Sequence, residues 1–239
     1  MRSAAQTLTL AASLLLAGSL ASCDAAASAL EVLESAQGSA AEAPAAADPS
    51  LAVDVAQALE LLQGIPVKGR APKTGYSRDE FGPAWADVDR NGCDTRNDIL
   101  ARDLTGETFK AGTNNCVVTA GTLADKYTGA TINFTRGQDT SPDVQIDHIV
   151  PLSDAWQKGA QQLSANQRKE LANDPLNLMA ADGPTNSAKG DRDAATWLPP
   201  NEAFRCEYVA RQTAVKATYK LWVTQAEHDA VASILEGCR

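Results

Sequence analysis

The sequence predicts an α+β domain in which a few short strands are combined with a larger number of helices. A β-branched run over residues 144–152 and an apolar run over 176–181 have the length and composition of strands. Near both ends of residues 51–239, apolar residues instead recur at helical spacing. With 239 residues, of which 44% are hydrophobic, the chain can build one sizeable core. A wholly disordered chain is therefore excluded.

The charge and histidine content exclude two kinds of protein. The formal charge of -9 counts against a protein that coats nucleic acid through overall positive charge. Residues 24–60 hold seven acids and no base, whereas residues 61–239 hold 23 acids and 20 bases. The formal charge of residues 61–239 is therefore only -3, and this part of the chain can still present a basic cleft. Two histidines also exclude a zinc centre with three imidazole ligands.

The N-terminus has the pattern of an export signal. Arg2 precedes an apolar run over residues 8–20, which is too short to span a bilayer in its own right, and the run ends in Leu-Ala-Ser-Cys. This ending resembles the lipobox of bacterial lipoproteins, which implies that residues 1–22 are removed and that Cys23 is acylated. An ordinary secretory signal, with Cys23 incidental, is the alternative. Residues 23–50, rich in Ala, Ser, Glu and Pro, are expected to form a solvated tether.

Four cysteines remain after Cys23, and their even number agrees with export. Three pairings are possible; we favour Cys93–Cys116 with Cys206–Cys238, because each bond then closes a loop within one half of the chain. A structural zinc site is the less favoured alternative, because no C-x-x-C pair is present.

The folded domain is expected over residues 51–239. A first helix over residues 51–62 should end at Gly64 and Pro66. The following loop holds the densest basic stretch of the chain, which either is simply solvated or contacts phosphate, and its members are Lys68, Arg70, Lys73 and Arg78.

Residues 87–98 resemble a calcium loop in spacing. Oxygen-bearing side chains alternate at Asp87, Asp89 and Asn91, and Gly92 follows at the sharp turn. The last position is Asp98 where Glu is usual, and Cys93 would restrict the wrap if it is disulfide-bonded. A polar turn leading into a helix over residues 97–104 is therefore preferred to a calcium site.

The order of elements after residue 144 is strand, long connection, strand, helix. A helix over residues 156–173 is expected between the two strands, and a helical stretch over 183–197 should follow the second strand. Two closing helices, over residues 204–219 and 225–235, should be joined by a short strand over 219–223. His228, at the start of the last helix, is interpreted as a surface residue.

These residues resemble the HNH endonucleases of the ββα-metal type. The resemblance is carried by the string Asp147-His148-Ile149-Val150-Pro151-Leu152, by Asn177-Leu178 on the second strand, and by Asn186-x-x-Lys189 opening the helix. The further strings Asn173-Asp174-Pro175-Leu176 and Trp197-Leu198-Pro199-Pro200 look like exported nucleases related to the C-terminal domain of GmrSD-type restriction enzymes. The resemblance covers roughly residues 60 to 239 and implies a ββα-metal core near residues 144–197, surrounded by further helices.

The resemblance also implies roles for single residues. His148 would be the general base, held by the side-chain amide of Asn177, while Asp147 and Asn186 would bind one divalent metal. Two protein oxygens completed by water suit Mg²⁺ or Mn²⁺. Lys189, Arg96 and Arg192 are candidate contacts to substrate phosphate. With an ordinary histidine pKa, activity should rise through roughly pH 6 to 8.

We therefore expect an exported endonuclease that is anchored through Cys23 to the outer face of the cytoplasmic membrane. Its expected substrate is DNA, with RNA as an open alternative, and its expected reaction is hydrolysis of phosphodiester bonds. It is expected to act as a monomer. The alternative is a surface-binding lipoprotein that uses an inactive HNH-like fold.

Overall fold

The computed structural model describes residues 54–238, which have a mixed α+β architecture, as predicted. Residues 1–53 and 239 lie outside the described residues, and with them lie the predicted signal segment, Cys23 and the tether. The described α-helices are α1 (Val55–Gly64), α2 (Thr95–Asp103), α3 (Leu152–Gln157), α4 (Ala165–Asn173), α5 (Gly183–Lys189), α6 (Arg205–Thr218) and α7 (Gln225–Gly237). The strands are β1 (Leu104–Phe109), β2 (Val118–Ala124), β3 (Thr131–Thr135), β4 (Val144–His148) and β5 (Leu178–Asp182). Four short 3₁₀ turns complete this part: η3 (Arg78–Phe81), η4 (Ser141–Asp143), η5 (Ala160–Gln162) and η6 (Glu202–Phe204).

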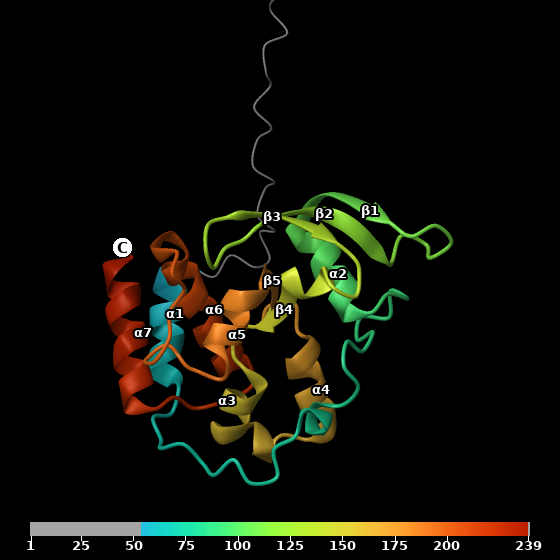
Figure 1. Cartoon of the computed structure of the whole chain (residues 1–239). Coiled ribbons are helices and arrows are strands. Elements are labelled where there is room, and N and C mark those ends of the chain that lie inside the picture. The colour runs from blue at the N-terminus through green and yellow to red at the C-terminus, as the bar shows by residue number, and fades with distance from the viewer. Residues whose placement is uncertain (1–53, 239) are drawn as a thin grey trace, which may run out of the picture. The chain divides into compact units, whose positions relative to one another are not determined.

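Two separate antiparallel sheets organise the domain. Strands β1, β2 and β3 form one sheet, and β4 pairs with β5 in the register Val144↔Asp182 to His148↔Leu178. Helix α5 follows β5 without a linker and packs on both strands of this pair. In Figure 1 the β4–β5 pair lies in the middle of the domain, with α2 on one side and α5 and α6 on the other. None of the helices within residues 54–238 is long and apolar enough to serve as a membrane span.

Strand β4 is held between apolar clusters. Ile146 packs in a cluster with side chains of α2 and of the three-stranded sheet, such as Leu100 and Phe134. The next apolar residue, Ile149, belongs instead to the cluster that joins α1, α6 and α7. Because close-packed interiors resist displacement, the residues between these two anchors are fixed in position.

A buried network of charged side chains joins segments that are distant in the sequence. Lys158 contacts three carboxylates at 2.6–2.7 Å, those of Asp154, Asp193 and Glu227. Lys216 of α6 also pairs with Asp154 and Glu227, and Arg70 closes the network at Asp154 and Asp193. Paired and hydrogen-bonded charges can be buried without leaving an isolated ion, which is how this cluster ties α3, α6 and α7 together.

Both predicted disulfides are confirmed. Cys93 is bonded to Cys116, with their Cα atoms 5.1 Å apart, and Cys206 to Cys238, with their Cα atoms 6.0 Å apart. The first bond links the turn before α2 to the segment before β2, and the second links the start of α6 to the end of α7. Each bond therefore closes a local loop, as expected from the spacing.

The single helix predicted over residues 156–173 is wrong. The chain forms α3, η5 and α4 in succession, and the break falls at Gly159, whose φ of +120° is not helical. A side chain at Gly159 would meet the Trp222 ring at 3.1 Å, so both the positive φ and the close approach of that ring favour glycine. Ser164 then starts α4 with a capping box, in which its side chain and that of Gln167 bond reciprocally to the backbone.

Three further differences concern where an element ends or whether it forms. Helix α5 stops at Lys189, because Gly190 follows in the left-handed region with φ +59°, and no helix reaches Trp197. The strand expected over 219–223 is reduced to one isolated bridge between Val223 and Val67. The β1–β3 sheet was not predicted, because its threonine-rich strands lack a clear apolar alternation.

Residues 87–98 form the expected polar turn. Asp87 accepts a hydrogen bond from the Gly92 amide at 3.0 Å, and Asp89 accepts one from the Asn91 amide at 3.1 Å. The Asn91 side chain then donates to Asp98 at 3.1 Å. These carboxylates are turned toward the segment itself, and the turn leads into α2, which begins one residue after Asp94.

Candidate active site

A pocket of about 450 Å³ lies beside β4, where it is lined by residues from segments far apart in the sequence. It is bordered by all three residues expected at the metal and base positions: Asp147, His148 and Asn186. Arg96 borders it as well, together with Arg78 and Trp85. Asn177, Lys189 and Arg192 do not line this pocket.

The end of β4 explains how two adjacent residues serve one site. Neighbouring residues of a strand point to opposite faces, so Asp147 and His148 could not share a pocket within a regular strand. His148 is the last residue of β4, and Pro151 lies just before α3, so the chain leaves the sheet at this point. Both side chains are nearly buried, at 5% and 7% exposure, and both border the pocket.

His148 is held as a neutral imidazole. Its Nε2 lies 2.9 Å from the carbonyl oxygen of Ala172, which can only accept, so Nε2 carries the hydrogen and Nδ1 is left with a free lone pair. Burial lowers the pKa of His148 to about 4. The expected rise in activity through pH 6 to 8 therefore does not follow from His148, because the imidazole is already unprotonated in that range.

The carboxylate of Asp147 already has two partners on one oxygen. Oδ2 accepts hydrogen bonds from the Tyr127 hydroxyl and from Lys189 Nζ, the latter at 2.6 Å. Lys189 also donates to the His148 carbonyl oxygen at 2.6 Å. Oδ1 accepts no hydrogen bond from another described residue, so it is the oxygen that remains available to a ligand.

Lys189 is therefore not placed as expected. Its side chain is fully buried beneath the site, and that burial lowers its pKa. The ammonium pairs with Asp147 and cannot extend to a phosphate in the pocket. The spacing of Lys189 from Asn186 predicted that both lie on one turn of a helix. Whether the Lys189 side chain is buried or exposed depends on how α5 packs on β4.

Asn177 does not hold the imidazole of His148. Its Oδ1 accepts from the Val150 amide at 2.8 Å, and its Nδ2 donates to the Leu171 carbonyl at 3.2 Å. The imidazole is instead held by the carbonyl of Ala172, the next residue along α4. Asn177 thus links the backbone just after His148 to the end of α4, which corrects the direct contact that the resemblance implied.

Asn186 and the arginines complete the pocket. The Asn186 side-chain amide donates to Gln145 Oε1 at 2.9 Å, which leaves the side-chain oxygen, Oδ1, free of described partners. Arg96 is half-buried at the start of α2, and burial lowers its pKa, with the charge of Arg136 adding to the effect. Arg78 is exposed and forms no ion pair with another described residue. Arg192 is exposed but outside the lining.

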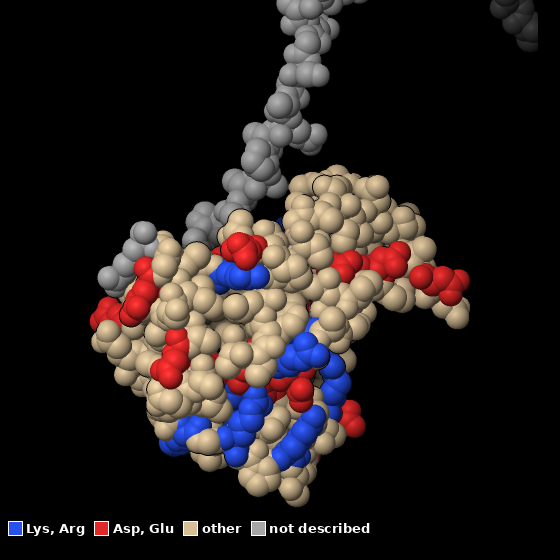
Figure 2. All heavy atoms as spheres, turned by 60° about the vertical axis from the view of Figure 1, so that its left-hand side comes forward, with Lys and Arg blue, Asp and Glu red and all other residues tan. Residues whose placement is uncertain are grey.

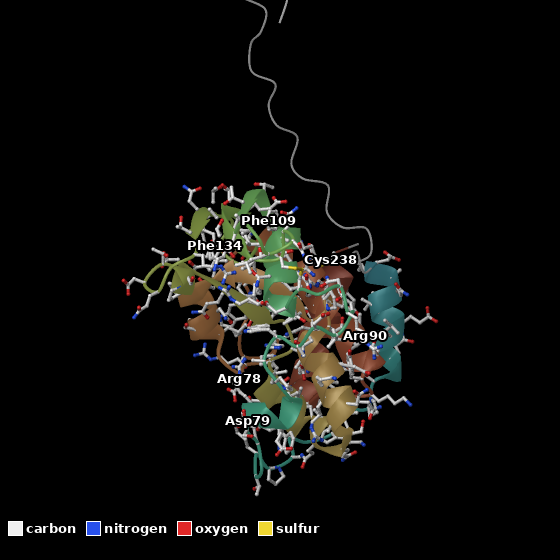
Figure 3. All side chains as sticks on the ribbon, turned by 90° about the vertical axis from the view of Figure 1, so that its right-hand side faces the viewer. Arg78, Asp79, Arg90, Phe109, Phe134 and Cys238 are labelled. Atoms are coloured by element: carbon white, nitrogen blue, oxygen red, sulfur yellow. A yellow bond between two sulfur atoms is a disulfide. The ribbon has the colours of Figure 1, made fainter. Side chains whose placement is uncertain are left out.

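The surface around the basic loop is locally rich in positive charge. Figure 2 shows Lys and Arg side chains gathered on the lower part of one face, around a few carboxylates. Arg78 and Asp79 lie at this lower end in Figure 3, away from Phe109 and Phe134 of the three-stranded sheet. On this face, most of the basic side chains therefore gather in one region, as the near-neutral charge of the domain allows.

The donor set limits how a metal could be bound. Within residues 54–238, no three His, Cys, Asp or Glu side chains cluster as metal ligands. A metal held by the residues that the resemblance implies would have two protein oxygens, Asp147 Oδ1 and Asn186 Oδ1, with other positions left to water or substrate. Such a sparse oxygen set fits a hard ion that retains its water, and does not fit a closed structural zinc site.

Comparisons with known proteins identify the family. Residues 94–234 match the family described as "GmrSD restriction endonucleases, C-terminal domain". An "Uncharacterized secreted protein" of Arthroderma benhamiae is 38% identical over 177 residues, which cover 73% of this chain and 81% of that protein. No solved structure matches the chain. Since the match spans more than half of the chain and includes β4, β5 and α5, the chain belongs to the family of GmrSD restriction endonuclease C-terminal domains.

Proposed function

We propose that this protein is a metal-dependent endonuclease that hydrolyses phosphodiester bonds, with a ββα-metal core formed by β4, β5 and α5. The observation that carries the proposal is the neutral, buried His148 at the wall of a pocket that also holds one free oxygen of Asp147 and of Asn186. Hydrolysis of a phosphodiester needs a base for the attacking water and positive charge near the phosphate. Family membership supports the same reaction class.

His148 would take the proton of the attacking water at Nδ1. The hydrogen bond from Nε2–H to Ala172 fixes the tautomer and the orientation of the ring. When Nδ1 accepts the proton, the carboxylate of the adjacent Asp147 stabilises the imidazolium. Burial lowers the pKa of His148, and the negative charge of Asp147 partly offsets that effect by raising it. Asn177 keeps the backbone around His148 in place, so it acts as a positioning residue.

Asp147 Oδ1 and Asn186 Oδ1 would hold the metal, which we propose is Mg²⁺ or Mn²⁺. When bound, such an ion stabilises charge on the phosphate and the leaving oxygen. Lys189 and Tyr127 hold the other oxygen of Asp147, and thereby orient the carboxylate. Arg78 and Arg96 are suited to bind substrate phosphate, since both border the pocket and guanidinium groups match phosphate geometry.

We further propose that the protein is exported and acts as a monomer on nucleic acid outside the cytoplasm. The secreted relative and the two disulfides support export. The lipid anchor at Cys23 is proposed from the sequence pattern alone. A Cys23→Ser variant should leave the membrane fraction or remain unprocessed; a processed variant that stays membrane-bound would exclude the anchor.

The experiment that tests the activity uses the purified chain with circular DNA, linear DNA and RNA, with Mg²⁺ or Mn²⁺ and with a chelator. Cleavage of circular DNA would identify an endonuclease, and loss of cleavage with the chelator would establish the metal requirement. His228→Ala is the matched control for His148→Ala, because His228 lies on α7, outside the pocket lining. Full activity of His148→Ala would reject the proposed base.

The ion pair between Lys189 and Asp147 favours a second candidate, a surface-binding lipoprotein with an inactive HNH-like fold. A buried ammonium beside the carboxylate reduces the charge that it offers to a metal. An inactive protein would bind nucleic acid or another polymer equally well with and without metal, and would show no cleavage in the same assay.

A further inference from the structure

Trp85 adopts an unusual backbone conformation at the edge of the pocket. Its φ of +57° lies in the left-handed region, which bulky side chains rarely occupy. Such strained residues persist only where the surrounding structure holds them, and they cluster at ligand-binding sites. The strain at Trp85 therefore points to a role for the indole ring in this place.

The segment around Trp85 is anchored on both sides. Before it, Phe81 is buried at 1% exposure, in contact with the Trp156 ring. After it, the Ala86 carbonyl accepts a hydrogen bond from the Thr95 hydroxyl at 2.5 Å. The backbone at Trp85 is thus held between two anchored points.

The indole ring borders the pocket next to His148. Trp85 packs against the cluster that includes Ile146, but it is only half-buried and it lines the pocket. Its ring is nearly parallel to the His148 ring, at 12° and with centroids 6.1 Å apart. The indole N–H groups of Trp156 and Trp222 donate to backbone carbonyls, whereas that of Trp85 donates to no other described residue.

We propose that Trp85 stacks a nucleobase of the bound strand, next to the phosphate that faces His148, and that the protein therefore prefers unpaired strands. This inference rests on the proposed function. A base inside a duplex is already stacked on its neighbours, so it must leave the duplex to reach an indole in a pocket. Aromatic platforms of this kind bind single strands without strong sequence preference.

The alternative role for Trp85 is to shield His148 from water. Both roles predict that loss of the indole impairs cleavage, so the test must measure binding. The full chain is placed in chelator, which prevents cleavage, and titrated with a fluorescent thymidine strand of about five nucleotides. The same titration is made with an all-abasic strand of equal length, and with a duplex. Trp85→Leu and Trp85→Phe are compared with Trp197→Leu, since Trp197 is also half-buried but lies outside the pocket lining.

Stacking predicts that the wild-type chain binds the thymidine strand roughly 5-fold to 150-fold more tightly than the abasic strand. Trp85→Leu should lose this difference, while Trp85→Phe and Trp197→Leu should keep most of it. The duplex should bind more weakly than the single strand. Equal loss of affinity for both strands in Trp85→Leu, or equal binding of both by the wild-type chain, would overturn the inference.

The outcome is separable from that of the proposed function. If the chain cleaves nucleic acid but shows no base dependence at Trp85, the inference fails and the nuclease stands. If base-dependent binding is found without cleavage under any metal condition, the inference stands and the nuclease fails.

Discussion

Replacing Lys189 with methionine removes the buried cation beside Asp147 while keeping most of the side-chain volume. The ammonium is fully buried and donates to Asp147 Oδ2 and to the His148 carbonyl, both at 2.6 Å. The variant leaves the Asp147 carboxylate with only the Tyr127 hydroxyl on that oxygen. It therefore tests the pair on which the arrangement of the site depends.

The expected loss of stability follows from the burial of both partners. Removing one member of a buried ion pair leaves an uncompensated charge and costs about 3–5 kcal/mol. Asp147 can reduce this cost by taking up a proton, so the lower end of the range, about 3 kcal/mol, is expected near neutral pH. Urea unfolding with the disulfides intact measures the change from the shift in midpoint and the slope.

The metal makes this prediction specific to the site. If Asp147 contributes to a metal site, Mg²⁺ or Mn²⁺ should stabilise Lys189→Met more than the wild-type chain, because the ion replaces the lost positive charge. A free metal concentration of about 100 times Kd would restore about 2.7 kcal/mol. Lys158→Met is the control, since Lys158 is equally buried among carboxylates but outside the pocket, and metal should not rescue it.

Two results would refute the reasoning. A Lys189→Met variant within about 1 kcal/mol of the wild-type chain would mean that the buried pair contributes little to stability. A variant that is destabilised as expected but indifferent to metal, as Lys158→Met should be, would mean that Asp147 is structural and does not bind the ion.

Three further predictions concern the base, the ionic network and a disulfide. His148→Ala should lower cleavage by about 10²-fold to 10⁴-fold. Wild-type activity should stay level across neutral pH and fall only near the pKa of about 4 that burial imposes on His148. A half-maximal point near pH 6.5 in the pH–rate profile would contradict this pKa. Burial alone raises the pKa of Asp193, but the hydrogen bond and charge of Lys158 outweigh burial and lower that pKa to about 2. The Asp193 carboxylate therefore stabilises the fold at pH values above its ordinary pKa of about 3.9, and this stabilisation is lost as pH falls toward 2. Asp193→Asn should lack this acid-dependent loss, and an acid-unfolding profile unchanged from the wild-type chain would exclude the contribution. Replacing Cys206 and Cys238 together by serine opens a loop with a sequence separation of 32 and should cost about 3–4 kcal/mol in urea unfolding, whereas a cost below about 1 kcal/mol would show that packing of α6 on α7 suffices.

The sequence determined the features that depend on local pattern. The even cysteine count and spacing led to the observed pairs Cys93–Cys116 and Cys206–Cys238, because the entropic cost of closing a loop rises with its length, which favours pairing within each half of the chain. The strands around His148 and Leu178 and the helix opening at Gly183 were likewise readable, since apolar runs and turn residues act over a few positions. The residues of the motif, Asp147, His148 and Asn186, indeed meet at one pocket.

The tertiary structure alone decided which atoms meet in the site. Lys189 was expected to face substrate, yet the packing of α5 on β4 buries it against Asp147. Asn177 was expected at the imidazole, but it bonds to the backbone while Ala172 holds the ring. Tyr127 and Trp85 come from loops 20 and 62 residues before Asp147 and carry no local signal of their destination. Sequence periodicity records which face of an element is apolar, whereas the depth of a polar side chain and its partners depend on contacts between elements that only the folded chain brings together.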